Sequence, residues 1–303
     1  MKKFIAVILA VILSAGCVYA EDLAGLKARA EQGDADAINK IGVLYYDGDE
    51  LEQKFAEALS YFNKAAELGN ADAYDNLGWM YENGDGVAED LPKALEFYKK
   101  GAEGGVLRSI NQIGWFYDYG LGGLMEDHDK AAEYYLKSAE LGNSTSQFNL
   151  GAYYLNEKDN PSEALKWFNK AAEQDHVGAL IIAGNMYKNG EGTEIDYKKA
   201  FDCYTRAIEL ENDAFAQAAL GHMYQNGFYV KKNINVAFNL YKKSAEQGNV
   251  RGQCNLGVMY ANGYGVKKNL KAAREWLEKA ANNEENWDGA RDEARKILKE
   301  ISK

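Results

Sequence analysis

The residue types that could carry catalysis or bind a metal are few and far apart in this sequence. The three histidines are His128, His176 and His222, and the 48 and 46 residues between them give no local metal-ligand spacing. The chain contains no Gly-x-Ser-x-Gly elbow, no phosphate-binding loop, no His-Glu-x-x-His motif and no Ser-x-x-Lys motif. The sequence therefore predicts no catalytic centre, no metal site and no cofactor.

The cysteines do not form a framework either. Beyond Cys17 the chain contains Cys203 and Cys254, far fewer than a small secreted domain held together by disulfides would carry. We expect the fold to be stabilised by side-chain packing, and Cys203 to be a buried, unreactive thiol.

Charge excludes one class of partner. The chain has 46 acidic and 35 basic residues and a net charge of −11, whereas nucleic-acid binding depends on lysine and arginine that neutralise phosphates. Residues 21–160 carry 27 acidic and 12 basic residues, a net of −15, and residues 161–303 carry 19 and 21, a net of +2. The asymmetry indicates either a solvated acidic surface or a partner with a basic segment that docks on the N-terminal half.

Residues 1–20 have the pattern of a signal peptide. Lys2 and Lys3 precede ten apolar residues, 4–13, a run too short to span a bilayer. Val18-Tyr19-Ala20 favours cleavage before Glu21, which predicts an exported protein, periplasmic or secreted, with no transmembrane segment in the mature chain. The alternative is a lipoprotein acylated at Cys17, although the leucine of that lipobox stands one position early.

The elements that must position any site follow from an internal repeat. Of 303 residues 30 are glycine and 2 are proline, so glycine serves something more regular than loops. A glycine recurs at intervals of 33 to 37 residues, and each is followed three residues later by tyrosine. These motif glycines are Gly42, Gly78, Gly114, Gly151, Gly184, Gly221 and Gly257. Seven such units predict a solenoid of stacked repeats.

Each unit contains two helical patterns. Ala37, Ile41, Leu44 and Tyr45 fall on one stripe of a first helix, and residues 58–66 repeat this spacing for a second helix. A glycine pair separates the two helices in most units, where glycine can close a helix in the left-handed conformation. The fold expected is all-α, with repeats at 33–68, 69–104, 105–141, 142–174, 175–210, 211–247 and 248–282, and capping helices within 21–32 and 283–303.

These units resemble the Sel-one-like repeat family, a relative of the tetratricopeptide repeats. The likeness is carried by Asn76-Leu77-Gly78-Trp79-Met80-Tyr81, by the turn Gly84-Asp85-Gly86-Val87 and by Lys93-Ala94, and it covers residues 33–282. It implies a right-handed α/α superhelix that acts as an adaptor or scaffold for other proteins. Some exported, cysteine-rich relatives are described as β-lactamases or penicillin binders, but they carry a cysteine pair in each repeat, which this chain lacks.

The resemblance also implies which residues would meet a partner, because the first helices of related repeats line a concave face. The residue after each motif glycine would then point into a groove, at Val43, Trp79, Trp115, Ala152, Asn185, His222 and Val258. With residues three before and four after the glycine, the first three repeats give an aromatic and acidic groove of Asn39, Tyr46, Asp75, Trp79, Glu82, Asn111, Trp115 and Asp118. Tryptophan is enriched at binding hot spots, but Trp79 and Trp115 could equally pack between helices.

The function expected from these features is an exported, monomeric scaffold or regulator that binds a partner protein or peptide. Two alternatives stay open at this point. One is a cell-envelope enzyme of the β-lactamase or penicillin-binding type, and the other is a secreted factor that binds a host protein.

Overall fold

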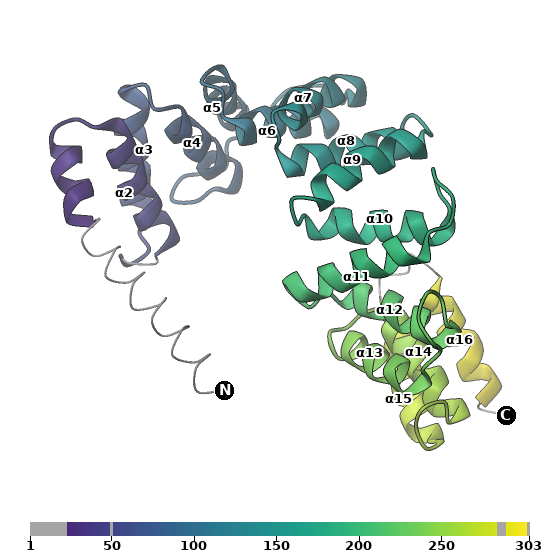
Figure 1. Ribbon diagram of the computed structural model, residues 1–303. Coiled ribbons are helices and arrows are strands. Elements are labelled where there is room, and N and C mark those ends of the chain that lie inside the picture. Colours follow the sequence, from purple (N-terminus) through teal and green to yellow (C-terminus); the bar gives the residue numbers. More distant parts are fainter. Residues whose placement is uncertain (1–22, 49–50, 284–288, 302–303) are drawn as a thin grey trace, which may run out of the picture. The chain divides into compact units, whose positions relative to one another are not determined.

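The computed structural model describes residues 23–48, 51–283 and 289–301 (Figure 1). The signal segment, Cys17 and Glu21 lie outside these residues. Within them the chain is helical and contains no strand. A helix over residues 23–31 comes first. The helices that follow are α2 (Ala35–Asp47), α3 (Phe55–Glu67), α4 (Ala71–Asn83), α5 (Leu91–Glu103), α6 (Leu107–Asp118), α7 (His128–Glu140), α8 (Ser144–Asn156), α9 (Pro161–Ala172), α10 (Val177–Asn189), α11 (Tyr197–Glu211), α12 (Ala214–Asn226), α13 (Ile234–Glu246), α14 (Val250–Asn262), α15 (Leu270–Asn282) and α16 (Ala290–Ile301).

The helices from α2 to α15 form seven helix hairpins, so the predicted all-α repeat solenoid is confirmed. The chain divides into two compact units, Met1–Ser146 and Gln147–Lys303, which we call the N-terminal and C-terminal units. Within each unit, the second helix of one hairpin packs against the first helix of the next, as for α3 with α4 and α11 with α12. No helix in the described ranges is both long and apolar enough to cross a bilayer.

The motif glycine allows the two helices of a hairpin to approach closely. At Gly78 an added Cβ would lie 2.7 Å from the ring of Tyr98 on the second helix. The same approach recurs in every hairpin, where the residue facing the motif glycine is Phe62, Tyr98, Tyr135, Phe168, Tyr204, Tyr241 or Leu277. A large side chain on the second helix thus occupies the space that glycine leaves on the first.

The paired turn glycines have two different tasks. Gly84 ends α4 in the left-handed conformation, with φ of 74°. Gly86 also has a positive φ, and an added Cβ would lie 2.6 Å from the β-carbon of Phe55 in the preceding repeat. Gly192 packs in the same way on the backbone of Pro161. The first glycine closes a helix, and the second lets the turn touch the preceding hairpin.

Most second helices begin at a side chain that caps them. Asp90, Asp127, Asn160 and Asp196 each accept a hydrogen bond from a backbone N–H three residues further on. These bonds satisfy donors that have no partner inside the helix. Pro92 and Pro161 stand in the first turn of their helices, where proline removes no hydrogen bond.

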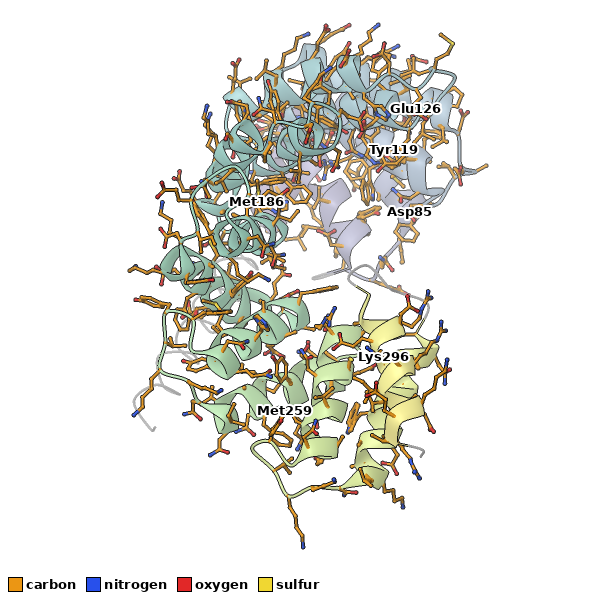
Figure 2. All side chains as sticks on the ribbon, turned by 90° about the vertical axis from the view of Figure 1, so that its right-hand side faces the viewer. Asp85, Tyr119, Glu126, Met186, Met259 and Lys296 are labelled. Carbon is orange, nitrogen blue, oxygen red and sulfur yellow. The ribbon has the colours of Figure 1, made fainter. Side chains whose placement is uncertain are left out.

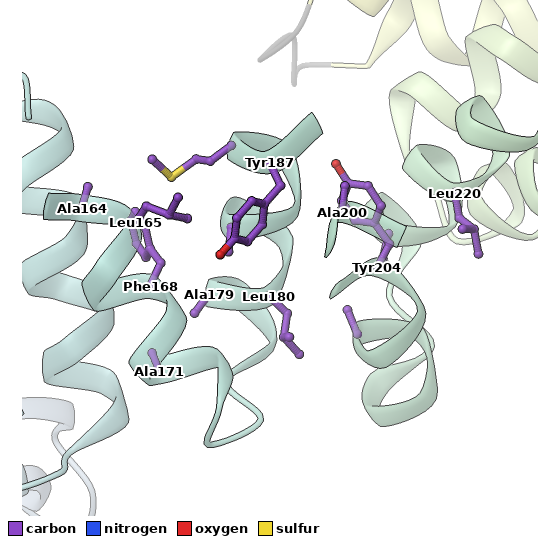
Figure 3. Close-up of a cluster of buried hydrophobic side chains, with 14 of the residues drawn as sticks. Ala164, Leu165, Phe168, Ala171, Ala179, Leu180, Tyr187, Ala200, Tyr204 and Leu220 are labelled. Carbon is purple, nitrogen blue, oxygen red and sulfur yellow. The ribbon is translucent and has the colours of Figure 1, made fainter. Parts of the chain in front are cut away.

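Buried side chains link one hairpin to the next within each unit. Figure 3 shows part of the largest cluster, in which Phe168 of α9, Leu180 of α10, Tyr204 of α11 and Leu220 of α12 are buried together. At the C-terminal end, Ala290 and Ala294 of α16 are fully buried against α14 and α15. This helix covers apolar surface that a further repeat would otherwise cover.

Candidate binding surfaces

Three positions on each first helix define the predicted groove: three residues before the motif glycine, one after it and four after it. We call them groove positions −3, +1 and +4. They repeat along the chain, so the side chains at equivalent positions can be compared directly. The N-terminal unit holds all eight residues predicted from the sequence to bind a partner.

Groove position −3 forms polar links between successive repeats of the N-terminal unit. Asn76 Nδ2 donates to Asn39 Oδ1 at 3.0 Å, and Ser146 Oγ donates to Asn111 Oδ1 at 2.9 Å. Asn39, Asp75 and Asn111 are all buried, with at most 8% of the residue exposed. Their side chains connect neighbouring first helices and offer a partner little surface.

Asp75 is a buried carboxylate with two donors from the next repeat. Ser109 Oγ donates to its Oδ1 at 2.6 Å, and the guanidinium of Arg108 donates to its Oδ2. A second nitrogen of Arg108 donates to Asn76 Oδ1 at 2.9 Å. Burial raises the pKa of Asp75, while the charge of Arg108 and the bond from Ser109 oppose that rise. Arg108 therefore supplies a charge that favours the ionised form of this carboxylate and opposes the effect of burial.

Two acidic residues at groove position +4 accept hydrogen bonds from buried tyrosines of their own hairpins. Tyr98 donates to Glu82, and Tyr135 donates to Asp118 at 3.3 Å. Burial and the nearby carboxylate both raise the pKa of each tyrosine. Nδ1 of His128 also lies 2.7 Å from Oδ1 of Asp118. These carboxylates are half-buried, and each already accepts a hydrogen bond from a tyrosine of its own hairpin.

Tyr46, Trp79 and Asp85 form a hydrogen-bonded chain across the first two repeats. Trp79 Nε1 donates to Tyr46 Oη at 2.7 Å, and Tyr46 Oη donates to Asp85 Oδ2 at 2.5 Å. Burial, followed by the bond to Asp85, raises the pKa of Tyr46 to about 12. Trp79 is 38% exposed, so its indole ring is held in place and still meets solvent. Asp85 was missed from the sequence, although it stands between the two turn glycines.

The side chain of Trp115 packs against a buried cluster that includes Tyr98 and Phe116, and its ring also lies beside Tyr119, the residue that follows α6. Its ring centroid lies 5.8 Å from that of Phe116 and 5.2 Å from that of Tyr119. Tyr119, which the sequence reasoning also missed, is 61% exposed. Figure 2 labels Tyr119 and Asp85, which follow α6 and α4 respectively. Partner binding by Trp79 and Trp115 stays a prediction.

The C-terminal unit contains a cleft with a volume of about 660 Å³. Groove positions −3, +1 and +4 of two successive repeats line it, with contributions from α14 and α16. These lining residues are Ile181, Asn185, Lys188, Ala218, His222 and Gln225, together with Arg251, Asn255 and Glu293. The volume is in the range of ligand sites. Groove positions therefore border a cleft in the fifth and sixth repeats, whereas the tryptophans indicated a groove in the first three repeats.

Basic residues shape the electrostatics of this cleft. Burial lowers the pKa of His222 first, and the positive charges of Lys188 and Arg251 lower it further. Nη1 of Arg251 lies 2.5 Å from Oε2 of Glu293, which is the carboxylate that α16 brings to the cleft. A neutral His222 therefore lies in a positive field at neutral pH.

The described part of the chain has no group of three or more histidine, cysteine, aspartate or glutamate side chains that could hold a metal ion. Cys203 is half-buried, where full burial was expected. Burial raises the pKa of its thiol to about 11, so it is protonated at neutral pH and a poor nucleophile.

The comparison with protein families decides the identity of the repeats. The Sel1 repeat matches seven times, at residues 35–70, 71–106, 107–143, 144–176, 178–212, 214–249 and 250–284. The chain belongs to the Sel1 repeat family. The resemblance inferred from the glycine motif is therefore confirmed.

Curated Sel1 relatives match only a part of their own length. Protein sel-1 homolog 2 of Mus musculus is 34% identical over 90 residues, which are 30% of this chain and 13% of that protein. A putative ERAD-associated E3 ubiquitin-protein ligase component of Schizosaccharomyces pombe is 30% identical over 96 residues, 31% of this chain and 14% of the relative.

Solved Sel1 structures match over far more of the chain. One is c5321, a protective antigen present in uropathogenic Escherichia coli strains and displaying an SLR fold. It has a TM-score of 0.78 and 31% identity, and the match covers 91% of this chain and 58% of that one. A Sel1 repeat protein from Oxalobacter formigenes has a TM-score of 0.66 and 30% identity, over 94% and 81% of the two chains.

Proposed function

We propose that this Sel1 repeat chain is an exported, monomeric scaffold that binds extended segments of partner proteins at the groove positions of its first helices. The observation that carries the proposal is the cleft of about 660 Å³ in the C-terminal unit, because equivalent positions of two successive repeats border it. A row of such positions suits an extended ligand, since each repeat offers the next stretch of chain a similar set of contacts.

Two relatives bear on this proposal, one on protein binding and the other on export. The S. pombe protein is named as a component of an E3 ubiquitin ligase, which is an assembly of proteins. The E. coli protein of similar fold is a protective antigen. That a protein of this fold is a protective antigen agrees with the proposal that the present chain is exported.

In the N-terminal unit, the proposed ligand is a basic segment. Trp79 offers an indole that is fixed by its bond to Tyr46, and Asp85 lies at the other end of the same hydrogen-bonded chain. A lysine or arginine side chain can stack on an indole ring and pair with a carboxylate. The net charge of −15 over residues 21–160 would also speed the approach of a cationic partner.

Replacing Trp79 and Trp115 together by alanine is expected to weaken the binding of basic peptides by about 10- to 100-fold. Hot-spot tryptophans contribute more than about 1 kcal/mol each, and 1.4 kcal/mol corresponds to a factor of ten. Peptides would first be selected from a random 12-residue display library on the full exported chain. Fluorescence anisotropy would then give the affinity of a labelled basic peptide at low and high salt.

Trp276→Ala is the matched control, because Trp276 is half-buried, as Trp115 is, but stands on the second helix α15. Its removal should change the affinity less than twofold. Thermal melts followed by circular dichroism would establish that all variants stay folded. The proposal for this surface fails if binding of the basic peptide is insensitive both to salt and to the loss of Trp79 and Trp115.

Export is tested separately, through the mass of the mature N-terminus in the producing cell. A chain that begins at Glu21 agrees with signal-peptide cleavage, and a chain that begins at an acylated Cys17 identifies a lipoprotein. Recovery from the medium would favour a secreted factor, whereas retention in the periplasm would favour an envelope scaffold. An uncleaved chain found in the cytoplasm would contradict export.

A further inference from the structure

The carboxamides in the cleft of the C-terminal unit are oriented by buried tyrosines. Tyr204 Oη donates to Asn185 Oδ1 at 2.7 Å, and Tyr241 Oη donates to Gln225 Oε1 at 2.7 Å. A carboxamide has one oxygen acceptor and an NH₂ group with two donors. Because the oxygens already accept from the tyrosines, the NH₂ groups are the parts of Asn185 and Gln225 that can bind a ligand in the cleft.

The charged residues of the cleft, like these NH₂ donors, favour a ligand that carries hydrogen-bond acceptors and negative charge. Lys188 comes from α10 and Arg251 from α14, and both line the cleft beside His222. The acidic lining residue, Glu293, is within 2.5 Å of Arg251. With His222 neutral, the lining residues that the structure describes carry two positive charges and one negative charge, so their summed charge is positive.

The same groove position differs in charge between the two units. At position +4 the second and third repeats carry Glu82 and Asp118, which accept hydrogen bonds from Tyr98 and Tyr135. In the fifth and sixth repeats position +4 carries Lys188 and Gln225, which line the cleft. The charge asymmetry of the sequence, −15 against +2, is therefore expressed at equivalent places on the first helices.

We infer that the cleft of the C-terminal unit binds an extended acidic segment of a partner protein. Side-chain carboxylates of the segment pair with Lys188 and Arg251, and its peptide carbonyls accept hydrogen bonds from the NH₂ groups of Asn185 and Gln225. Apolar side chains of the segment contact Ile181 and the half-exposed Phe215, which also line the cleft. The inference rests on the proposed scaffold function and gives the cleft a ligand class different from that of the N-terminal unit.

The test uses the random 12-residue library on the full chain, with peptides displayed through their C-termini so that only side-chain carboxylates are offered. Wild-type protein should enrich a class of acidic peptides. One of these is then synthesised with an acetylated N-terminus and an amidated C-terminus. Its affinity should fall at least tenfold for Lys188→Gln, which removes a charge-assisted hydrogen bond, and further for Lys188→Glu, which adds a repelling charge.

The matched control is Lys267→Glu, because Lys267 is an exposed residue of the turn before α15 and does not line the cleft. It makes the same charge change in the same unit and should alter the affinity less than twofold. Thermal melts show whether the Lys188 variants fold. If Lys188→Glu does not fold, the test rests on Lys188→Gln.

A second readout follows the imidazole of His222 by NMR during titration with the acidic peptide. In the part of the chain that the structure describes, the titratable groups that line the cleft with it are Lys188 from α10, Arg251 from α14, Glu293 from α16 and the phenol of Tyr204 from α11. A bound carboxylate stabilises the imidazolium, so peptide binding should raise the pKa of His222 and the affinity should increase as the pH falls. A pKa that stays constant or falls would contradict a carboxylate in this cleft.

The outcomes separate the two proposals. Enrichment of acidic peptides that depend on Lys188 supports the inference. If no acidic peptides are enriched, or if their binding ignores Lys188, the inference is overturned even where basic peptides that depend on Trp79 are found. If the library yields no peptide that is sensitive to a groove position, the scaffold function itself fails.

Discussion

Arg108→Ala is expected to lower the free energy of unfolding by about 2–3 kcal/mol at pH 7. The substitution leaves Asp75 buried at 3% exposure without its cation, and breaking one side of a buried ion pair costs about 3–5 kcal/mol. We expect a value below that range because the side chain of Arg108 is 53% exposed and water can reach the vacated space. Urea denaturation followed by circular dichroism measures the change.

The loss of stability caused by Arg108→Ala should depend on pH in a defined direction. Burial raises the pKa of Asp75 above its unfolded value, so the folded state binds the proton more tightly than the unfolded state does. Without Arg108 this rise is larger, because a cation that lowers the pKa has been removed. The destabilisation is therefore greatest at neutral pH and shrinks as the pH falls through the folded-state pKa of Asp75. The double variant Arg108→Ala with Asp75→Asn should be more stable at pH 7 than Arg108→Ala alone.

Arg206→Ala is the matched control for a pair at the surface. Arg206 Nη2 lies 2.6 Å from Asp175 Oδ2, and both side chains are 46% exposed. Exposed pairs contribute about 0–1 kcal/mol, so this substitution should cost less than about 1 kcal/mol. Equal losses for Arg108→Ala and Arg206→Ala, or a loss at Arg108 that does not change with pH, would show that the charge of Asp75 is not what Arg108 stabilises.

The solenoid was predictable because its constraints are local and repeated seven times. Each motif glycine is needed where a large side chain of the second helix approaches, as Tyr98 does at Gly78, and each left-handed C-cap favours a residue such as Gly84. A constraint that recurs at a fixed interval is visible in one sequence without any alignment. The same logic gave the helix hairpins, whereas the groove positions were inferred from the resemblance to related repeats.

The roles of particular groove residues could not be predicted, because they depend on partners in the next repeat. Asp75 and Arg108 are 33 residues apart, and nothing near either residue indicates that they meet. The tyrosines that bind Glu82 and Asp118 were recognisable as core residues, but the direction of their hydroxyl groups was not. The predicted residues Asn39, Asp75, Asn111, Glu82 and Asp118 therefore lie in polar links of the fold.

The cleft was missed for a different reason. The sequence argument chose repeats by their tryptophans, whereas a cleft depends on space, and small side chains such as Ala218 and Ala219 line this one. Asn185 and His222 occupied the correct groove position but carried no distinctive signal by residue type. The volume between helices depends on the side chains of several repeats together, so it cannot be inferred from the residue type at one position.

Gly192→Ala is expected to destabilise the C-terminal unit by about 2–5 kcal/mol. Gly192 has φ of 69°, and an alanine in the left-handed region costs about 1–2 kcal/mol. The added Cβ would also lie 2.4 Å from the carbonyl carbon of Pro161, a backbone atom at the start of α9 that cannot move aside as a side chain can. Such overpacking costs a further 1–3 kcal/mol or so.

Gly248→Ala separates the cost of the left-handed backbone from the cost of overpacking. Gly248 has φ of 90°, and its added Cβ would meet no atom within 4 Å, so this variant carries the backbone cost alone. Thermal and urea unfolding of both variants should therefore differ by the cost of pushing α9 away from the turn at residue 192. If the two variants lose the same stability, the second turn glycine serves only its own φ angle. A larger loss at Gly192 would instead establish that close contact between successive hairpins is what requires glycine there.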